Sequence, residues 1–195
     1  MPVRKFEGRL CIVRLELSPS EIPDLLSRHA KHYPGARLLE AAGRELAQQK
    51  FEPSASVDFV QRVHKWGGGQ RQMGRVRDKN PPGAVAAALS EAVGLAQRGD
   101  VSGGVECIRR LSHVGQSFAS KQLRFLEPLR AVILDSVLRT GLGYPDTPEG
   151  YAEFLGDCQI MLAEAQQSGK IEPSLAEALR VCDIEAAIFA KLQGY

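Results

Sequence analysis

The chain has 195 residues, of which 44% are apolar and only 6% aromatic, and its formal net charge is +2. This length fits one domain, or one domain with a small appendage, built around a single core. Helix-forming residues dominate, and neither a secretory leader nor an apolar run of about 18 residues occurs, so we expect an all-α, soluble, cytoplasmic protein rather than a sheet or membrane protein.

The first half of the chain is typical of successive helices separated by Pro and Gly. Residues 8–16 favour either one short strand or a lead into the first helix. The expected helices span about 20–32, 36–50, 54–66 and 82–97, the last opened by Pro82. Residues 70–82 are basic, which predicts an irregular or briefly helical segment.

The second half continues the helical pattern with one extended interruption. A short helix over 102–111, a turn over 112–116 and a helix over 117–126 are expected. Glu127-Pro128 ends that helix, residues 132–134 read as extended, and Asp135 can cap a helix over 136–141. Start signals at Pro148 and Pro173 predict helices to about residues 167 and 193.

Charge is distributed unevenly along the chain. Residues 62–79 hold six bases against one acid, and residues 109–130 hold five bases against one acid. Residues 146–195 hold nine acids against three bases. This polarity favours a polyanionic partner bound by the basic middle, although two solvated helix faces would give the same counts.

Neither Cys nor His residues have the spacing of a metal site. The four cysteines are far apart, with no C-x-x-C pair, and read as free or buried thiols in a reducing compartment. His29, His32 and His64 favour surface or core roles. We therefore expect neither a metal nor any other cofactor.

The segment around Gly115 is typical of a phosphate-binding turn. Leu111-Ser-His-Val-Gly115 is a hydrophobic-x-x-hydrophobic-Gly run that precedes a helix, where outward backbone N–H groups and the helix dipole favour an anion. Gly115 permits a close approach, because a Cβ would obstruct it. Many helix corners use Gly, so the turn alone does not establish binding.

The helix after the turn carries a polar stripe. At 100° per residue, Ser117, Ser120, Lys121 and Arg124 fall within one arc of about 100°, opposite the apolar residues. An ordinary amphipathic helix would look the same. Asp135 adds specificity, because it stands where an extended segment enters the next helix and can turn its carboxylate toward the stripe.

These residues together resemble a known superfamily. The run Leu111-Ser-His-Val-Gly-Gln-Ser-Phe-Ala119, with the trailing Asp135, resembles the helix-hairpin-helix DNA glycosylases. Over about residues 59–162 the chain looks like the bacterial 8-oxoguanine DNA glycosylase-like proteins, through Trp66-Gly-Gly-Gly, Ser117-Phe-Ala-Ser-Lys-Gln-Leu-Arg-Phe-Leu126 and Val132-Ile-Leu-Asp-Ser136.

The resemblance implies a helical bundle of two lobes with a cleft between them. Within a single domain over 1–195, it predicts an N-terminal helical extension (1–53), a hairpin-containing catalytic core (54–169) and a C-terminal helix (170–195). The implied partner is double-stranded DNA with a damaged or modified base, bound by a monomer near the nucleoid. No membrane partner is implied.

Asp135 maps onto the aspartate that lies near the sugar of the flipped nucleotide in this superfamily, and a helix-capping role is compatible with this one. Strand-nicking members carry a lysine two residues after the hairpin glycine, where this chain has Ser117. Lys121 lies one turn further along the same face and becomes the candidate nucleophile; a phosphate contact or pairing with Asp135 is the competing interpretation.

Other residues complete the predicted DNA interface. His113 replaces the first hairpin glycine of the family and becomes a candidate DNA contact beside Gly115, Gln116 and Ser117. Candidate residues for the base pocket are Trp66 and Phe118. Gln70 resembles a wedge residue, and Arg71, Arg75 and Arg124 are candidate backbone contacts. Trp66 also fits a plain core anchor, and the glycines after it fit a helix end.

The sequence therefore predicts a DNA glycosylase of base excision repair, with AP lyase activity if Lys121 attacks the sugar. An oxidised purine and a modified base of phage DNA, removed in defence, are both open as substrates. A non-catalytic helix-hairpin-helix DNA-binding protein is the first alternative. A helical protein-interaction domain is the second, favoured if the basic patches are scattered.

Overall fold

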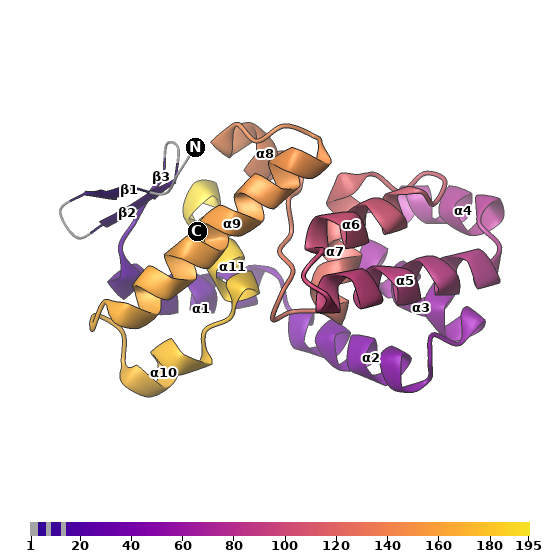
Figure 1. Ribbon diagram of the computed structural model, residues 1–195, viewed down its shortest axis with the longest axis horizontal. Coiled ribbons are helices and arrows are strands. Elements are labelled where there is room, and N and C mark those ends of the chain that lie inside the picture. The colour runs from indigo at the N-terminus through magenta and orange to yellow at the C-terminus, as the bar shows by residue number, and fades with distance from the viewer. Residues whose placement is uncertain (1–3, 7–8, 13–14) are drawn as a thin grey trace. The chain divides into compact units, whose positions relative to one another are not determined.

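The computed structural model describes residues 4–6, 9–12 and 15–195, with side chains from residue 15 onward. Most of this chain is helical (Figure 1). Contacts divide it into two compact units: unit 1 comprises Met1–Pro34 and Ser136–Tyr195, and unit 2 comprises Gly35–Asp135. The boundaries of these units differ from those of the predicted segments 1–53, 54–169 and 170–195. The helix that begins at Ala36, for example, lies in the predicted N-terminal extension but packs within unit 2.

Unit 1 is built around its last helix. Its elements are β1 (Arg4–Phe6), β2 (Arg9–Ile12), β3 (Leu15–Leu17), η1 (Pro19–Glu21), α1 (Ile22–His32), α8 (Ser136–Leu142), α9 (Pro148–Gln167), α10 (Pro173–Ala178) and α11 (Val181–Gln193). Helices α1, α8 and α9 and strand β3 all pack on α11, which is buried almost continuously from Val181 to Ala190. This helix therefore supplies the core of the unit.

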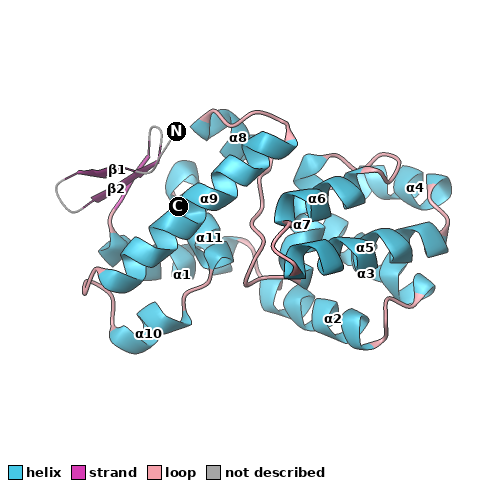
Figure 2. Ribbon diagram, in the orientation of Figure 1, coloured by secondary structure: helices cyan, strands magenta, loops and turns pink. Residues whose placement is uncertain are grey.

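The N-terminal strands depart from the expected all-α fold. Strands β1, β2 and β3 form an antiparallel sheet in sequence order, drawn in magenta in Figure 2. One short strand within 8–16 was the most that the sequence suggested. The register pairs Cys11 with both Arg4 and Glu16, and Leu17 buries its side chain completely. The helical prediction is otherwise confirmed for the described chain, which has eleven α-helices.

The predicted last helix, over 173–193, is wrong in one respect, because the structure divides it into α10 and α11. Leu179 and Arg180 take extended conformations, with ψ of 139° and 162°. Asp183 then accepts hydrogen bonds from the backbone N–H and the guanidinium of Arg180, at 2.8–2.9 Å. Capping of a new helix thus compensates for the break.

Unit 2 is entirely helical. Its elements are α2 (Ala36–Gln48), α3 (Pro53–Trp66), α4 (Gln70–Lys79), α5 (Pro82–Gln97), α6 (Val101–Arg109) and α7 (Gln116–Leu126). Helices α2, α3, α5 and α6 all pack on α7. Nine of the eleven α7 residues are buried, so this helix occupies the centre of the unit.

Close helix contacts in unit 2 depend on small residues. A Cβ on Gly43 of α2 would lie 2.5 Å from the carbonyl oxygen of Phe125 in α7. Similarly, a Cβ on Gly104 of α6 would lie 2.8 Å from the carbonyl oxygen of Ala92 in α5. Backbones therefore approach at these points to distances that no other residue allows.

Residues 70–79, expected to be irregular or briefly helical, form the regular helix α4, which packs on α3. Its only buried side chain is that of Val76, Met73 is half-buried, and the other residues of the helix are exposed. Within the described ranges, every helix is too short or too polar to cross a lipid bilayer.

Candidate active site

The predicted turn joins α6 to α7. Leu111 and Val114 are buried and pin the turn to the unit, as the hydrophobic-x-x-hydrophobic pattern predicts. His113, between them, is exposed and adopts a φ of +64°, a left-handed conformation that favours glycine. Gly115 caps α7 with an extended backbone (φ −84°, ψ 171°), and no atom lies within 4 Å of an added Cβ. The space beside Gly115 is therefore open.

Asn80 holds this turn from outside the hairpin. Its Oδ1 accepts from the backbone N–H of Ser112 at 2.8 Å, and its Nδ2 donates to the carbonyl of Ser112 at 3.0 Å and to that of Val76 at 2.6 Å. Asn80 is buried (6% exposed). The side-chain amide thus pairs with the turn as a neighbouring peptide would, and ties the end of α4 to the hairpin.

Lys121, Ser117 and Asp135 come together at the start of α7. Lys121 Nζ donates to Ser117 Oγ and to Asp135 Oδ2, both at 3.0 Å. The side chains of Lys121 and Asp135 are only 7% and 15% exposed. Because helical side chains point toward the N-terminus, the Lys121 amine lies beside Ser117, one turn before it in α7.

Ser120 fixes the segment that carries Asp135. Its hydroxyl accepts from the backbone N–H of Leu134 at 3.2 Å and donates to the carbonyl of Ser117 at 3.1 Å. Ser120 is fully buried, and the segment over 131–134 is buried beside it. One side chain of α7 therefore holds the extended segment in the position that brings Asp135 to Lys121.

The glycines that follow Trp66 lie against the side chains of Lys121 and Phe118. A Cβ on Gly67 would lie 2.9 Å from Lys121 Cδ and 3.1 Å from Phe118 Cε1, and one on Gly69 would overlap the Phe118 ring. Lys121 Nζ lies 5.5 Å from the centre of that ring. The glycines thus do more than end α3, because their bare backbone covers the lysine side chain.

His64 lies under Phe118 and completes this part of the site. The two rings stack with centroids 4.1 Å apart and an angle of 6° between their planes. His64 is fully buried, and its Nδ1 lies 2.9 Å from the carbonyl of Val60. Its Nε2 has no hydrogen-bond partner among the described residues. Burial lowers the pKa of His64, the hydrogen bond to Val60 raises it, and the Lys121 charge lowers it; the net direction is down. The imidazole beside Lys121 is therefore held neutral.

Arg124 does not occupy the predicted position. Helix α7 is covered on both faces, so the polar stripe is not a solvent-facing surface, and Arg124 is only 5% exposed. Its Nη1 donates to Glu40 Oε1 on α2 at 2.7 Å, and its guanidinium lies 4.6 Å from the centre of the Phe125 ring. The expected phosphate contact by Arg124 is replaced by a buried ion pair within unit 2.

Gln116 is also drawn inward. Its side chain is buried, and its Oε1 accepts from Arg109 Nη1 at 3.3 Å, while the same nitrogen donates to Glu106 at 2.8 Å. Any DNA contact by Gln116 would therefore use its backbone N–H. That group and the N–H of Ser117 occupy the first turn of α7, which leaves them outside the helical hydrogen-bond ladder.

The remaining predicted residues divide between the core and the surface. Trp66 is half-buried and packs edge-on against Phe125 with ring centroids 4.8 Å apart, as a core anchor does. Phe118 is half-buried beside Lys121.

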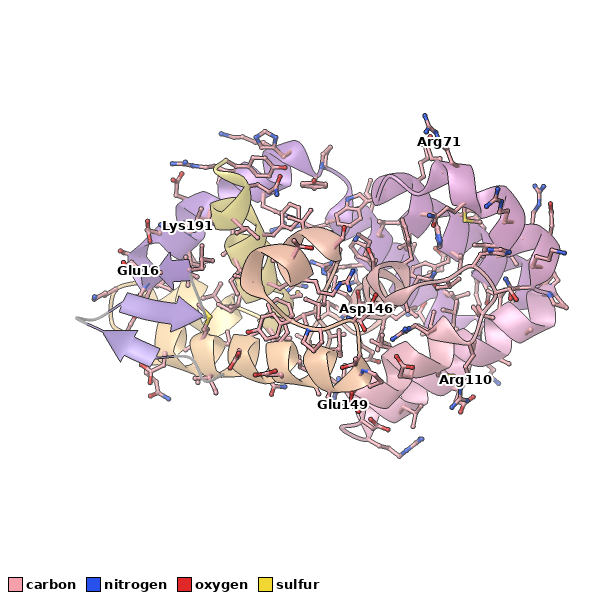
Figure 3. The ribbon with its side chains drawn as sticks, turned by 90° about the horizontal axis from the view of Figure 1, so that it is seen from above. Glu16, Arg71, Arg110, Asp146, Glu149 and Lys191 are labelled. Carbon is pink, nitrogen blue, oxygen red and sulfur yellow. The ribbon has the colours of Figure 1, made fainter. Side chains whose placement is uncertain are left out.

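The predicted polar contacts lie on the surface. Gln70, Arg71 and Arg75 are exposed on α4, and Figure 3 shows Arg71 projecting away from the unit. Arg110, at the end of α6, projects from a different edge of the same unit (Figure 3).

The sequence interpretation missed the part that Glu40, His64 and Asn80 play in the site, and it placed Ser120 in the polar stripe without identifying its backbone partners. Asn80 carried a signal, because a lone Asn before Pro81-Pro82 is typical of a helix end, but its partner lies 32 residues away. The role of Ser120 depends on a segment 14 residues further on. Within the described residues, no group of His, Cys, Asp or Glu has the arrangement of a metal site.

Comparison with known protein families identifies the family of the chain. The family described as "Putative 8-oxoguanine DNA glycosylase OGG-like protein" matches residues 38–189. This match includes all of α3 to α10 and the Lys121–Asp135 pair. No curated protein and no solved structure matches the chain.

Proposed function

The chain belongs to the family described as "Putative 8-oxoguanine DNA glycosylase OGG-like protein", and on that premise we propose that it flips a damaged or modified base out of duplex DNA and cleaves the N-glycosidic bond. We further propose that Lys121 is the nucleophile and that Asp135 is the catalytic carboxylate. The observation that carries this proposal is the placement of Lys121 Nζ, 3.0 Å from both Asp135 Oδ2 and Ser117 Oγ.

The pair supports a covalent route. Asp135 takes a proton from the Lys121 ammonium across their hydrogen bond, and the neutral amine bonds to C1′ of the flipped nucleotide. The bond from C1′ to the base nitrogen breaks, and its electron pair leaves with the base, which takes the proton that Asp135 received. Asp135 next takes a proton from the new C1′ ammonium and gives it to O4′ as the C1′–O4′ bond opens and the nitrogen lone pair forms the iminium. Transfer of a C2′ proton to Asp135 then gives an enamine, which expels the 3′-phosphate with the electron pair of the C3′–O bond.

The hairpin supports phosphate binding beside that pair. The open space at Gly115 and the N–H groups of Gln116 and Ser117 at the start of α7 favour a phosphate oxygen. His113 is exposed at the tip of the turn and remains a candidate contact. Phe118 offers an aromatic surface next to Lys121 for the flipped base, with an oxidised purine and a phage-type modified base as the two substrate classes.

Borohydride trapping tests the nucleophile. Duplexes that carry either 8-oxoguanine or a modified pyrimidine of phage DNA are incubated with the wild type, Lys121→Ala, Lys121→Arg and Asp135→Asn. Lys121→Arg keeps the charge beside Asp135 but cannot form a Schiff base, and Lys31→Ala, on the exposed face of α1, is the matched lysine control. We expect an adduct with the wild type and Lys31→Ala only, and base release slowed by about 10²–10⁴-fold in Asp135→Asn.

The outcomes separate the candidate mechanisms. If the Lys121→Ala variant still forms a trapped adduct, the assignment of Lys121 as the nucleophile is wrong. Base release without any adduct would instead indicate hydrolysis by an Asp135-activated water, the route that Ser117 suggests by analogy with hydrolytic relatives. DNA binding without base release from any duplex would show a non-catalytic DNA-binding protein, and the absence of DNA binding would favour a protein-interaction domain.

A further inference from the structure

A groove lies between α3 and α4 in unit 2. Its volume is about 360 Å³, and the residues that line it are Gln61, Lys65, Gln70, Met73, Gly74 and Arg77. Two of these are cations, two are amides and none is acidic. Arg77 Nε donates to the exposed Asp78 at 3.3 Å, but the pair is solvent-screened and the other guanidinium N–H groups face no described acid. The lining therefore suits an anion.

Gly74 destabilises α4 without a packing reason, which is expected if a ligand occupies the groove beside it. It lies inside α4, where glycine is less favourable than alanine, yet no atom lies within 4 Å of an added Cβ. Packing within the protein therefore does not require glycine at this position. The missing side chain leaves the floor of the groove open, which is what close approach by a ligand backbone needs.

The groove and the candidate active site share one segment. Between residues 64 and 70, His64, Gly67 and Gly69 contact Phe118 or Lys121, whereas Lys65 and Gln70 line the groove. On α4, the groove residues Gln70, Met73, Gly74 and Arg77 fall within an arc of about 100°, and Arg71 and Arg75 lie outside it. The exposed bases of α4 thus form two separate surfaces.

We infer that this groove binds the sugar-phosphate backbone of a DNA strand next to the flipped nucleotide. Lys65 and Arg77 contact successive phosphates, the amides of Gln61 and Gln70 donate to backbone oxygens, and Met73 contacts a sugar. The inference rests on the proposed function, which supplies DNA as the ligand. It adds a second binding surface, separate from the hairpin turn and from the Arg71 and Arg75 face.

The glycine gives a test in which stability and binding change in opposite directions. Gly74→Ala and Gly74→Gln should raise the Tm by about 2–4 °C, because both improve the helix. The same changes should weaken binding of a fluorescent duplex, several-fold for Ala and at least tenfold for Gln, as the added side chain fills the groove. Gly83→Ala is the matched control, since Gly83 is an exposed glycine of α5 with equal open space.

The cations are tested by the dependence of binding on salt. Lys65→Ala/Arg77→Ala should reduce the slope of log Kd against log salt by about 2, because each lost phosphate contact contributes about 0.9. Arg37→Ala/Arg44→Ala removes the same charge from the exposed face of α2 and should leave the slope near that of the wild type. Polyglutamate should compete with the duplex only weakly.

Failure of this inference is distinct from failure of the glycosylase proposal. If the wild type binds and processes DNA while the Gly74 variants and Lys65→Ala/Arg77→Ala bind as tightly as their controls, the groove assignment is overturned and the glycosylase stands. If polyglutamate competes as well as DNA, the groove takes an acidic polypeptide and the DNA assignment is wrong. If the wild type binds no DNA, the proposed function fails first.

Discussion

At the scale of single residues, two positions depart from the glycosylase pattern, and the fold accommodates both. His113 takes the left-handed conformation that a glycine would adopt at no cost, at an expense of about 1–2 kcal/mol. Lys121 lies one helical turn beyond Ser117, and its amine donates a hydrogen bond back to Ser117 Oγ. The turn thus holds a left-handed backbone at a residue other than glycine, and the lysine amine lies beside Ser117.

His64 predicts how stability depends on pH. Its pKa is lowered in the folded protein from an ordinary value of 6.5, mainly by burial, so below pH 6.5 the unfolded chain gains a proton that the folded chain resists. Stability should therefore fall as the pH drops from 6.5 toward the lowered value. His64→Gln should flatten the fall by up to about 1.4 kcal/mol per pH unit, measured by urea unfolding across this window. An unchanged slope would contradict a buried neutral imidazole.

At the scale of elements, most helices could be predicted because their signals are local. The glycines after Trp66 marked the end of α3, and Pro82 marked the start of α5, each at the bound that the structure has. The break at Leu179 and Arg180 could not be predicted, because no Pro or Gly marks it and the capping by Asp183 resembles an ordinary helical ion pair. The N-terminal sheet was missed because its three strands are short.

The Asn80 clamp predicts that the hairpin depends on α4. Asn80→Ala removes the partner of the buried Val76 carbonyl and of the part-buried backbone groups of Ser112, and should cost about 2–3 kcal/mol in the free energy of unfolding, measured by urea denaturation. Asn80→Asp should also destabilise, because a carboxylate oxygen would face two carbonyls. Gln72→Ala, which removes an exposed amide from the same helix, should change stability by less than about 0.5 kcal/mol. Equal losses in the two alanine variants would contradict the clamp.

At the scale of the whole molecule, charge follows the division into units. Unit 2 has fifteen bases against ten acids, a net charge of +5, and unit 1 has ten bases against thirteen acids, a net charge of −3. The sequence already indicated a basic middle and an acidic C-terminal part. It did not show that five of the middle bases are engaged in ion pairs within unit 2, namely Arg77, Arg109, Lys121, Arg124 and Arg130.

This polarity predicts where DNA protects the protein. Hydrogen exchange in the presence of undamaged duplex should slow mainly in α4 and in the turn before α7, within the positive unit. Raising the salt from 50 to 200 mM should weaken the complex by about tenfold or more and remove that protection. Equal or stronger protection of α9 and α11, in the acidic unit, would contradict the assignment of the DNA surface to unit 2.

The candidate site could be predicted in part, for a physical reason. Lys121 and Asp135 lie on elements whose local signals are clear, and their pairing follows from a helix face and an extended segment that returns to it. Arg124 was misplaced because a helical wheel does not reveal that α7 is covered on both faces. Glu40, whose carboxylate compensates the buried charge of Arg124, lies 84 residues away in sequence.

Asp135 is also the residue at which the chain leaves unit 2, since Ser136 begins α8 of unit 1. It is anchored on one side through Leu134 and Ser120, and on the other it is joined by a single peptide bond to a helix of the other unit. The carboxylate proposed to accept the proton therefore belongs to the last residue of unit 2, directly before the first residue of α8 in unit 1.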